Sequence, residues 1–152
     1  MARRRESRPR LGAARGSTLA RLILDTTVLI DAERDEEALD EQIADDDDVA
    51  VAAITAAELL VGVELADRRR RSRREGYVSE ILAMIPVESY DLDVARAHAH
   101  LLAHVRRSGN QRGAHDLIIA ATAVAREREI VSSDVRAFDG LPGVVLRSVG
   151  RG

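Results

Sequence analysis

The stretch "RLILDTTVLIDAE", residues 21–33, decides how the chain folds. It begins with the apolar run Leu22, Ile23 and Leu24, which is typical of a buried strand, and the apolar pattern resumes after Asp25 as a helix. Burying the carboxylate of Asp25 beside such a run is costly unless that carboxylate is paired, hydrogen-bonded or bound to a metal. Asp25 is therefore a candidate functional residue, although Asp is also a favoured N-cap for the helix that follows.

Strand-like and helix-like segments alternate along the rest of the chain. Strands are expected at 49–53, 130–134 and 143–149, and helices at 36–45, from 55 towards the Arg run at 68–74, around 78–85, at 91–109 and at 115–129. Such alternation produces parallel strands with helices on both faces. The expected fold is an α/β domain over residues 21–149, with three α/β/α layers around a central parallel sheet. Residues 1–20 are expected to form a flexible basic arm.

The composition excludes several classes of function. The chain of 152 residues has no Cys, which excludes disulfides, thiol nucleophiles and zinc–thiolate sites. All 23 basic residues are Arg, so the Lys of a P-loop or of a Schiff base is missing. Aromatic residues are only 2% of the chain, which argues against platforms that stack bases. No apolar run approaches a membrane span and no signal-peptide core follows the basic N-terminus, so a soluble cytoplasmic protein is expected.

Four carboxylates stand at the ends of expected strands or in the first turns of expected helices: Asp25, Glu58, Asp116 and Asp134. In a parallel sheet these positions converge on one edge, so the four side chains should share a single cleft. Carboxylates that close repel one another unless a cation compensates their charge. Oxygen ligands without Cys suit one or two Mg²⁺ or Mn²⁺ ions, which activate water and stabilise phosphoryl oxygens. The predicted chemistry is phosphodiester hydrolysis.

Each carboxylate also has a capping interpretation. Glu58 ends the capping box "TAAE", Asp116 is favoured by the dipole of its helix, and Asp134 could cap the turn "VRAF". If all four acids were caps, the protein would be a non-catalytic RNA-binding or regulatory module. An aspartyl-phosphate phosphatase is a weaker rival, because that class needs a second Asp at the position of Thr27 and also needs a Lys.

Four stretches of the chain occur in a recognisable order: "LILDTTVLI", "ITAAELLVG", "AHDLIIAATA" and "IVSSDVRAF". In order and spacing they resemble the PIN-domain ribonucleases, and most of all the VapC-type toxins of bacterial toxin–antitoxin modules. The resemblance runs from about Leu22 to Val149. It places the four acids of the family on the four carboxylates named above. Ser132 stands at the usual Thr and Thr27 at the usual Asn or Ser, and both keep a hydroxyl, whereas His115 stands where Asn or Ala is common.

The resemblance implies an endoribonuclease that depends on Mg²⁺ or Mn²⁺ and is inhibited by an antitoxin encoded beside it. It also implies a homodimer, which could be part of a higher toxin–antitoxin assembly. Metal ligation is expected from Asp25, Glu58, Asp116 and Asp134, with Thr26, Ser132 and Ser133 as hydrogen-bond donors around them. Candidate RNA contacts are the arginines Arg68, Arg69, Arg70, Arg71, Arg73, Arg74 and Arg112, because guanidinium groups suit phosphates. The Arg run could equally be a solvated helix face.

Overall fold

The computed structural model describes residues 19–35, 40–41 and 43–150. Of the helix expected at 36–45, residues 36–39 and 42 lie outside the described residues, and residues 43–45 are not helical, so the expected end of this helix is wrong. The arm expected at 1–20 lies outside the described residues except for its last two residues. None of the helices within the described residues is long and apolar enough to cross a membrane.

A parallel sheet of five strands forms the centre of the molecule, in the order β3-β2-β1-β4-β5. The strands are β1 (Arg21–Leu24), β2 (Asp48–Ala52), β3 (Val87–Glu88), β4 (Glu129–Ser132) and β5 (Leu146–Ser148). Ile23 in the central strand β1 lies opposite Ala50 on one side and Ile130 on the other. The expected parallel sheet is confirmed. Strand β3 was not expected, because two residues are too few to show an alternating pattern.

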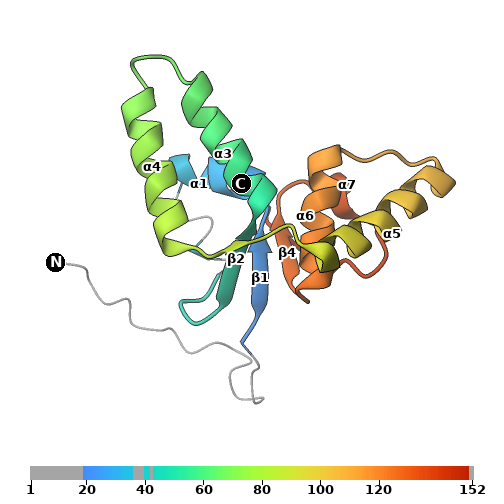
Figure 1. The fold of residues 1–152 in the computed structure, drawn as a ribbon. Helices are drawn as coiled ribbons and strands as arrows, with labels where there is room; N and C mark the ends of the chain where they lie inside the picture. Colours follow the sequence, from blue (N-terminus) through green and yellow to red (C-terminus); the bar gives the residue numbers. More distant parts are fainter. Residues whose placement is uncertain (1–18, 36–39, 42, 151–152) are drawn as a thin grey trace.

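Helices cover both faces of the sheet, as Figure 1 shows. One face carries α1 (Thr26–Arg34), α3 (Ala53–Leu65) and α4 (Arg71–Met84), and the other carries α5 (Leu92–Ser108), α6 (Ala114–Ala125) and α7 (Val135–Phe138). Leu22 and Leu24 belong to the core under the first set of helices, whereas Ile23 belongs to the core under the second set. Alternate side chains of a strand point to opposite faces, so the apolar run of β1 builds both cores. The expected three-layer fold is confirmed.

The helix boundaries agree with the sequence at α5 and differ at α3. Asp91 caps α5 by accepting a hydrogen bond from the N–H of Val94, and Gly109 ends it in the left-handed conformation, as expected. The single helix expected from Thr55 to the Arg run is wrong. Helix α3 ends at Leu65, and a turn follows in which the Asp67 carboxylate accepts from the N–H of Arg70 at 2.9 Å. Asp stabilises such turns by bonding to nearby backbone N–H groups.

A buried arginine that the sequence did not indicate ties four strands together. Arg128, immediately before β4, donates hydrogen bonds to the carboxylate of Glu88 in β3 and to that of Asp48 in β2. It also donates to the carbonyl of Leu22 in β1. Because its side chain is only 6% exposed, these contacts compensate a charge that burial would otherwise penalise.

Candidate active site

The candidate site lies at the carboxyl ends of the two central strands. Asp25 directly follows β1, and its N–H donates to the carbonyl of Val131 in the neighbouring strand β4 at 3.0 Å. Ser132 is the last residue of β4, and Asp134 follows two positions later. Ligands of open parallel sheets bind at this edge. The sheet therefore brings together two of the four carboxylates singled out in the sequence.

Asp25 is held by hydroxyl groups and does not cap its helix. It occupies the N-cap position of α1, but its side chain makes no capping hydrogen bond. Instead its Oδ2 accepts hydrogen bonds from Thr27 Oγ1 and from Ser132 Oγ, each at 2.7 Å. The carboxylate is 2% exposed, so these two hydroxyls fix its orientation in a buried position. The capping interpretation of the Asp25 side chain is wrong.

Ser132 connects Asp25 to Asp134. Its Oγ donates to Asp25 and accepts a hydrogen bond from the N–H of Asp134 at 2.9 Å. One carboxylate oxygen of Asp134 accepts from the N–H of Ala137 at 3.3 Å, which confirms that this residue caps the short helix α7. The cap engages Oδ1 alone, so the other carboxylate oxygen is not used by it. Ser133, expected to bond an acid directly, instead lies with its Oγ 3.5 Å from Thr27 Oγ1.

Glu58 reaches the site from α3. This helix begins at Ala53 with Ala52 as its N-cap, so Thr55 lies inside the helix and the expected capping box is wrong. Thr26 Oγ1 donates to Glu58 Oε1 at 3.2 Å and lies 3.3 Å from Thr55 Oγ1. The same carboxylate oxygen lies 3.7 Å from Nδ1 of His115 on α6. Glu58 is therefore oriented by the first residue of α1 and faces the first turn of α6.

Asp116, in the first turn of α6, experiences the charge of the other three acids. Its burial raises its pKa to about 6, and the carboxylates of Asp25, Asp134 and Glu58 add to the effect, while His115 opposes it. A carboxyl group whose pKa is raised by three neighbours of the same charge lies in a crowded anionic site. Gly113, the N-cap of α6, provides the space, because a Cβ at that position would lie 2.7 Å from Asp116 Oδ2.

The donor set fits a hard cation in chemistry and in charge. All four side chains offer carboxylate oxygens, and no described Arg forms an ion pair with Asp25, Asp116 or Asp134. Within the described ranges, no three Asp, Glu or His side chains converge as closely as the ligands of one metal ion must. The assignment of the four acids as metal ligands stays a prediction.

The arginines expected to contact RNA divide into two groups. Arg71 pairs with Glu64 at 3.5 Å and Arg74 with Glu33 at 3.7 Å. The other four arginines of the run, Arg68, Arg69, Arg70 and Arg73, are exposed and form no ion pair with any described residue. Arg112 lies apart from the run and donates to the backbone carbonyl of Arg136 in α7 and to that of Asp139 directly after it. Sequence reasoning missed Thr27 as a donor to Asp25, although its hydroxyl two residues beyond Asp25 was the available signal.

Comparison with known proteins agrees with this architecture. The sequence pattern of the PIN domain matches residues 22–143. VapC ribonuclease Y4jK of Sinorhizobium fredii is 36% identical over 131 residues, covering 78% of this chain and 90% of that protein. Ribonuclease VapC5 of Mycobacterium tuberculosis is 35% identical over 135 residues, covering 86% and 96%. The crystal structure of VapBC-5 from M. tuberculosis, a member of the VapBC family of toxin–antitoxin systems, matches with a TM-score of 0.69 and 34% identity, covering 84% of this chain and 97% of that chain.

The family match begins in β1 and ends after α7, so it contains every position of the candidate site, and the chain belongs to the PIN-domain family. Within that family, the chain is similar over most of its length to VapC proteins from two organisms. The resemblance seen in the four sequence stretches is confirmed.

Proposed function

We propose that this protein is a metal-dependent endoribonuclease that acts as the toxin of a toxin–antitoxin pair. The observation that carries the proposal is the gathering of Asp25, Asp134 and Glu58 around Asp116, whose carboxyl pKa is raised to about 6 by burial first and by these three carboxylates in addition. Among the described residues, no Arg forms an ion pair with Asp25, Asp116 or Asp134. Carboxylates gathered without such partners are expected where a divalent cation binds. The names of the two VapC relatives, both ribonucleases, support RNA as the substrate.

In this proposal Asp25, Glu58, Asp116 and Asp134 hold one or two Mg²⁺ or Mn²⁺ ions. A divalent cation supplies Lewis-acid stabilisation of phosphoryl oxygens and lowers the pKa of water. The chain itself supplies orientation. Thr27 and Ser132 hold Oδ2 of Asp25, Ser132 also positions the backbone of Asp134, and Thr26 orients Glu58. Hydrogen bonds of this kind orient the carboxylates of metal sites.

The alternative is a non-catalytic RNA-binding or regulatory module. Of the four caps that it requires, only Asp134 bonds a backbone N–H of its own helix. Thr26 and Ser132 donate to Glu58 and Asp25, whereas Ser133 would support the site only through Thr27. The contacts of the four acids therefore favour the catalytic function over the capping one.

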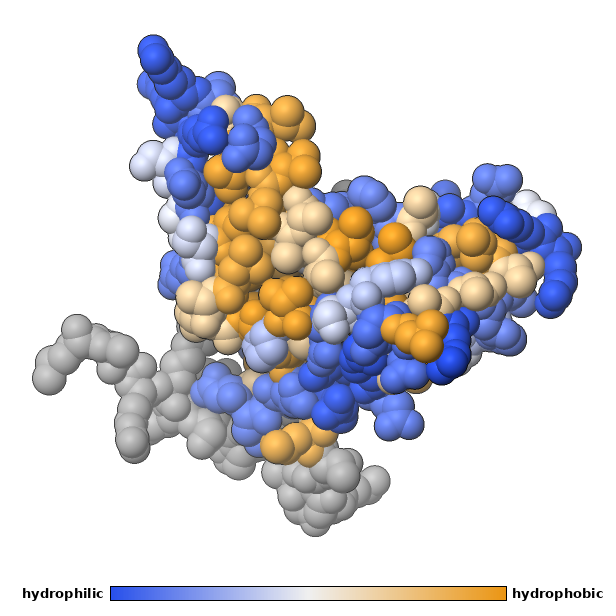
Figure 2. Space-filling model, in the orientation of Figure 1, coloured by the Kyte–Doolittle hydropathy of each residue, from blue (hydrophilic) through white to orange (hydrophobic). Residues whose placement is uncertain are grey.

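The partner in this proposal is a cognate antitoxin that covers the exposed apolar face of α3. Leu60, Val61 and Leu65 are 49%, 52% and 81% exposed, and Figure 2 shows apolar side chains gathered over this helix. Contiguous exposed apolar surface marks an interaction site. The solved relative from M. tuberculosis belongs to a toxin–antitoxin system. We also propose a homodimer, which could be part of a higher toxin–antitoxin assembly, and a location in the cytoplasm.

The decisive experiment measures cleavage of a panel of structured RNAs by partner-free protein in Mg²⁺, in Mn²⁺ or in EDTA. Asp25→Ala removes a buried carboxylate of the site, and Asp31→Ala removes an exposed carboxylate of the same helix as the matched control. We expect cleavage that requires the metal, is lost in Asp25→Ala and persists in Asp31→Ala. Binding of RNA without cleavage by folded wild-type protein would favour the non-catalytic alternative. Metal-dependent cleavage that survives in folded Asp25→Ala would contradict the site.

A further inference from the structure

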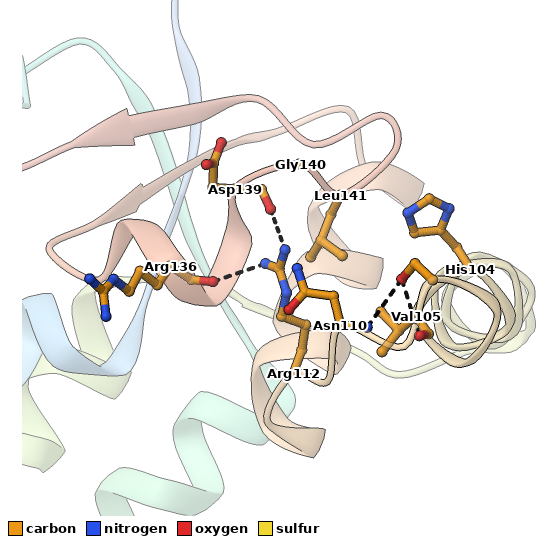
Figure 3. A pocket seen from close by; sticks show the side chains of 9 residues that line it. His104, Val105, Asn110, Arg112, Arg136, Asp139, Gly140 and Leu141 are labelled. Carbon is orange, nitrogen blue, oxygen red and sulfur yellow. Dashed lines mark hydrogen bonds between the residues drawn. The ribbon is translucent and has the colours of Figure 1, made fainter.

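A cavity of about 450 Å³ opens between the C-terminal part of α5, the loop before α6 and the turn after α7. Figure 3 shows the side chains of His104, Asn110, Arg112 and Leu141 around it. None of the four carboxylates of the candidate active site lines this cavity. It is therefore a separate feature that the proposed hydrolysis does not explain.

Arg112 gives the cavity a fixed positive charge. Its Nη1 donates to the carbonyl of Arg136 at 2.9 Å and its Nη2 to the carbonyl of Asp139 at 2.5 Å. Both acceptors are neutral, and Figure 3 shows the carboxylate of Asp139 pointing away from the guanidinium. The guanidinium thus keeps its charge and its orientation, and it still has N–H groups beyond the two that are bonded. A guanidinium that is oriented by carbonyls and keeps further N–H groups can bind a phosphate or stack on the face of a base.

The remaining walls combine apolar surface with a few polar groups. Val105 and Leu141 are buried and supply the apolar part. Asn110 supplies an exposed amide. Hydrogen bonds hold the backbone of its loop, because Ser108 Oγ accepts from the Asn110 N–H at 3.4 Å and donates to the Val105 carbonyl at 3.2 Å. A mainly preformed cavity of this size, with few and well-placed polar groups, is typical of small-molecule sites. An amide can read the hydrogen-bonding edge of a base.

The cavity is connected to the acidic site through two short pieces of chain. Arg112 precedes Gly113, the N-cap of α6, and Asp116 lies in the first turn of the same helix. Arg136 lies in α7, whose N-cap is Asp134. The Cα atoms of Arg112 and Asp116 cannot be more than roughly 15 Å apart, because four peptide units separate them. A single strand of RNA bound at the acids can therefore reach the lining of the cavity within a few nucleotides.

We propose that the cavity binds one unpaired nucleotide of the RNA substrate next to the scissile phosphate, with the phosphate on Arg112 and the base beside Asn110 and Leu141. This inference rests on the proposed nuclease function and adds to it a site that selects sequence. Direct readout of one base requires it to leave the stack, which single-stranded RNA permits at low cost.

The first test measures binding of the four ribonucleoside 5′-monophosphates to partner-free protein in EDTA, by NMR chemical-shift changes and calorimetry. We expect at least one of them to bind with shifts at Asn110, Arg112 and Leu141. Arg112→Gln should weaken binding about tenfold, because a charge-assisted contact to phosphate is lost. Arg107→Gln, which removes an exposed arginine of α5 that does not line the cavity, should leave the affinity unchanged.

The second test uses Asn110→Trp, which fills the mouth of the cavity from an exposed position and leaves the core intact. We expect this variant to lose mononucleotide binding and to change the nucleotide preference next to the cleaved bond. If no mononucleotide binds, or if binding survives in both Arg112→Gln and Asn110→Trp, the inference is wrong. Because the binding test needs no hydrolysis, wild-type protein that binds a mononucleotide but cleaves no RNA would overturn the nuclease proposal and leave a nucleotide site.

Discussion

Ser132 Oγ lies 2.7 Å from Asp25 Oδ2, although 107 positions separate the two residues in the sequence. The contact joins the ends of the two central strands, because Ser132 is the last residue of β4 and Asp25 directly follows β1. The same hydroxyl accepts from the N–H of Asp134. One buried oxygen atom thus sets the positions of two acids that the proposed mechanism uses.

Ser132→Ala should therefore reduce RNA cleavage about 10–100-fold, the usual loss when a partner that orients a ligand is removed. Stability should fall by about 1–3 kcal/mol, because a buried carboxylate oxygen loses a donor. Ser132→Thr keeps the hydroxyl and should retain most of the activity. The matched control is Ser148→Ala, which lies opposite Ser132 on β5 and is exposed. Full activity in Ser132→Ala would show that the hydroxyl does not position Asp25 for catalysis.

The fold could be predicted from the sequence because its signals are local. The apolar run of β1 identifies a strand buried on both faces, and the Asp91 and Gly109 caps define α5 within its own sequence. The sequence misplaces the start of α3 because "TAAE" has the pattern of a capping box, whereas Thr55 lies in the core beside Thr26. A tertiary contact therefore overrode a local preference.

The sequence predicts which acids form the site, because a parallel sheet places strand ends and helix starts at one edge. The four acids follow from their places at strand ends and helix starts, but the contacts that orient them do not. The role of Thr27 depends on the side-chain rotamer of Asp25. The cavity beside Arg112 requires α5 and α7 to be placed side by side, which no pattern within either segment specifies. Contacts between distant segments are what the sequence alone does not supply.

Loss of Arg128 should destabilise the sheet. Arg128→Met removes one partner from each of the carboxylates of Glu88 and Asp48, which keep Arg126 and Arg21, so the expected loss is about 1–3 kcal/mol. Urea unfolding of partner-free protein at neutral pH measures the change. The control, Arg96→Ala, removes an exposed arginine that lies 3.8 Å from Asp93 and should change stability by less than about 0.5 kcal/mol. Equal stability of the two variants would contradict this role of Arg128.

Gly113→Ala should weaken metal binding while changing stability little. The added Cβ would lie 2.7 Å from Asp116 Oδ2, and that oxygen ends a flexible side chain that can turn away. A displaced carboxylate should lower Mn²⁺ affinity about tenfold, as measured by calorimetry, and should reduce RNA cleavage with it. Gly76→Ala is the control, because a Cβ at this position in α4 meets no atom within 4 Å. Unchanged Mn²⁺ affinity in Gly113→Ala would mean that Asp116 does not bind the ion from this rotamer.

The crowding of Asp116 predicts an unusual dependence of stability on pH. In the folded protein, burial and the carboxylates of Asp25, Asp134 and Glu58 raise its pKa from 3.8 to about 6. The folded state then binds more protons than the unfolded state between these values, so the contribution of Asp116 to the free energy of unfolding falls as pH rises through this range.

Asp116→Asn removes that penalty, and it should stabilise metal-free protein above about pH 6 by about 1 kcal/mol, a value that allows for solvent screening of a half-buried group. The gain should vanish below about pH 4, where the wild-type carboxyl group is protonated in both states. Thermal unfolding in EDTA at both pH values, with Asp31→Asn as an exposed control, measures it. Mn²⁺ should then stabilise the wild type, because the ion compensates the negative charge of Asp116. It should not stabilise Asp116→Asn, because this variant lacks that carboxylate. A variant that is destabilised equally at both pH values would show that neither burial nor the other three carboxylates raise the pKa of Asp116 in the folded protein, and the metal site proposed from their crowding would lose its basis.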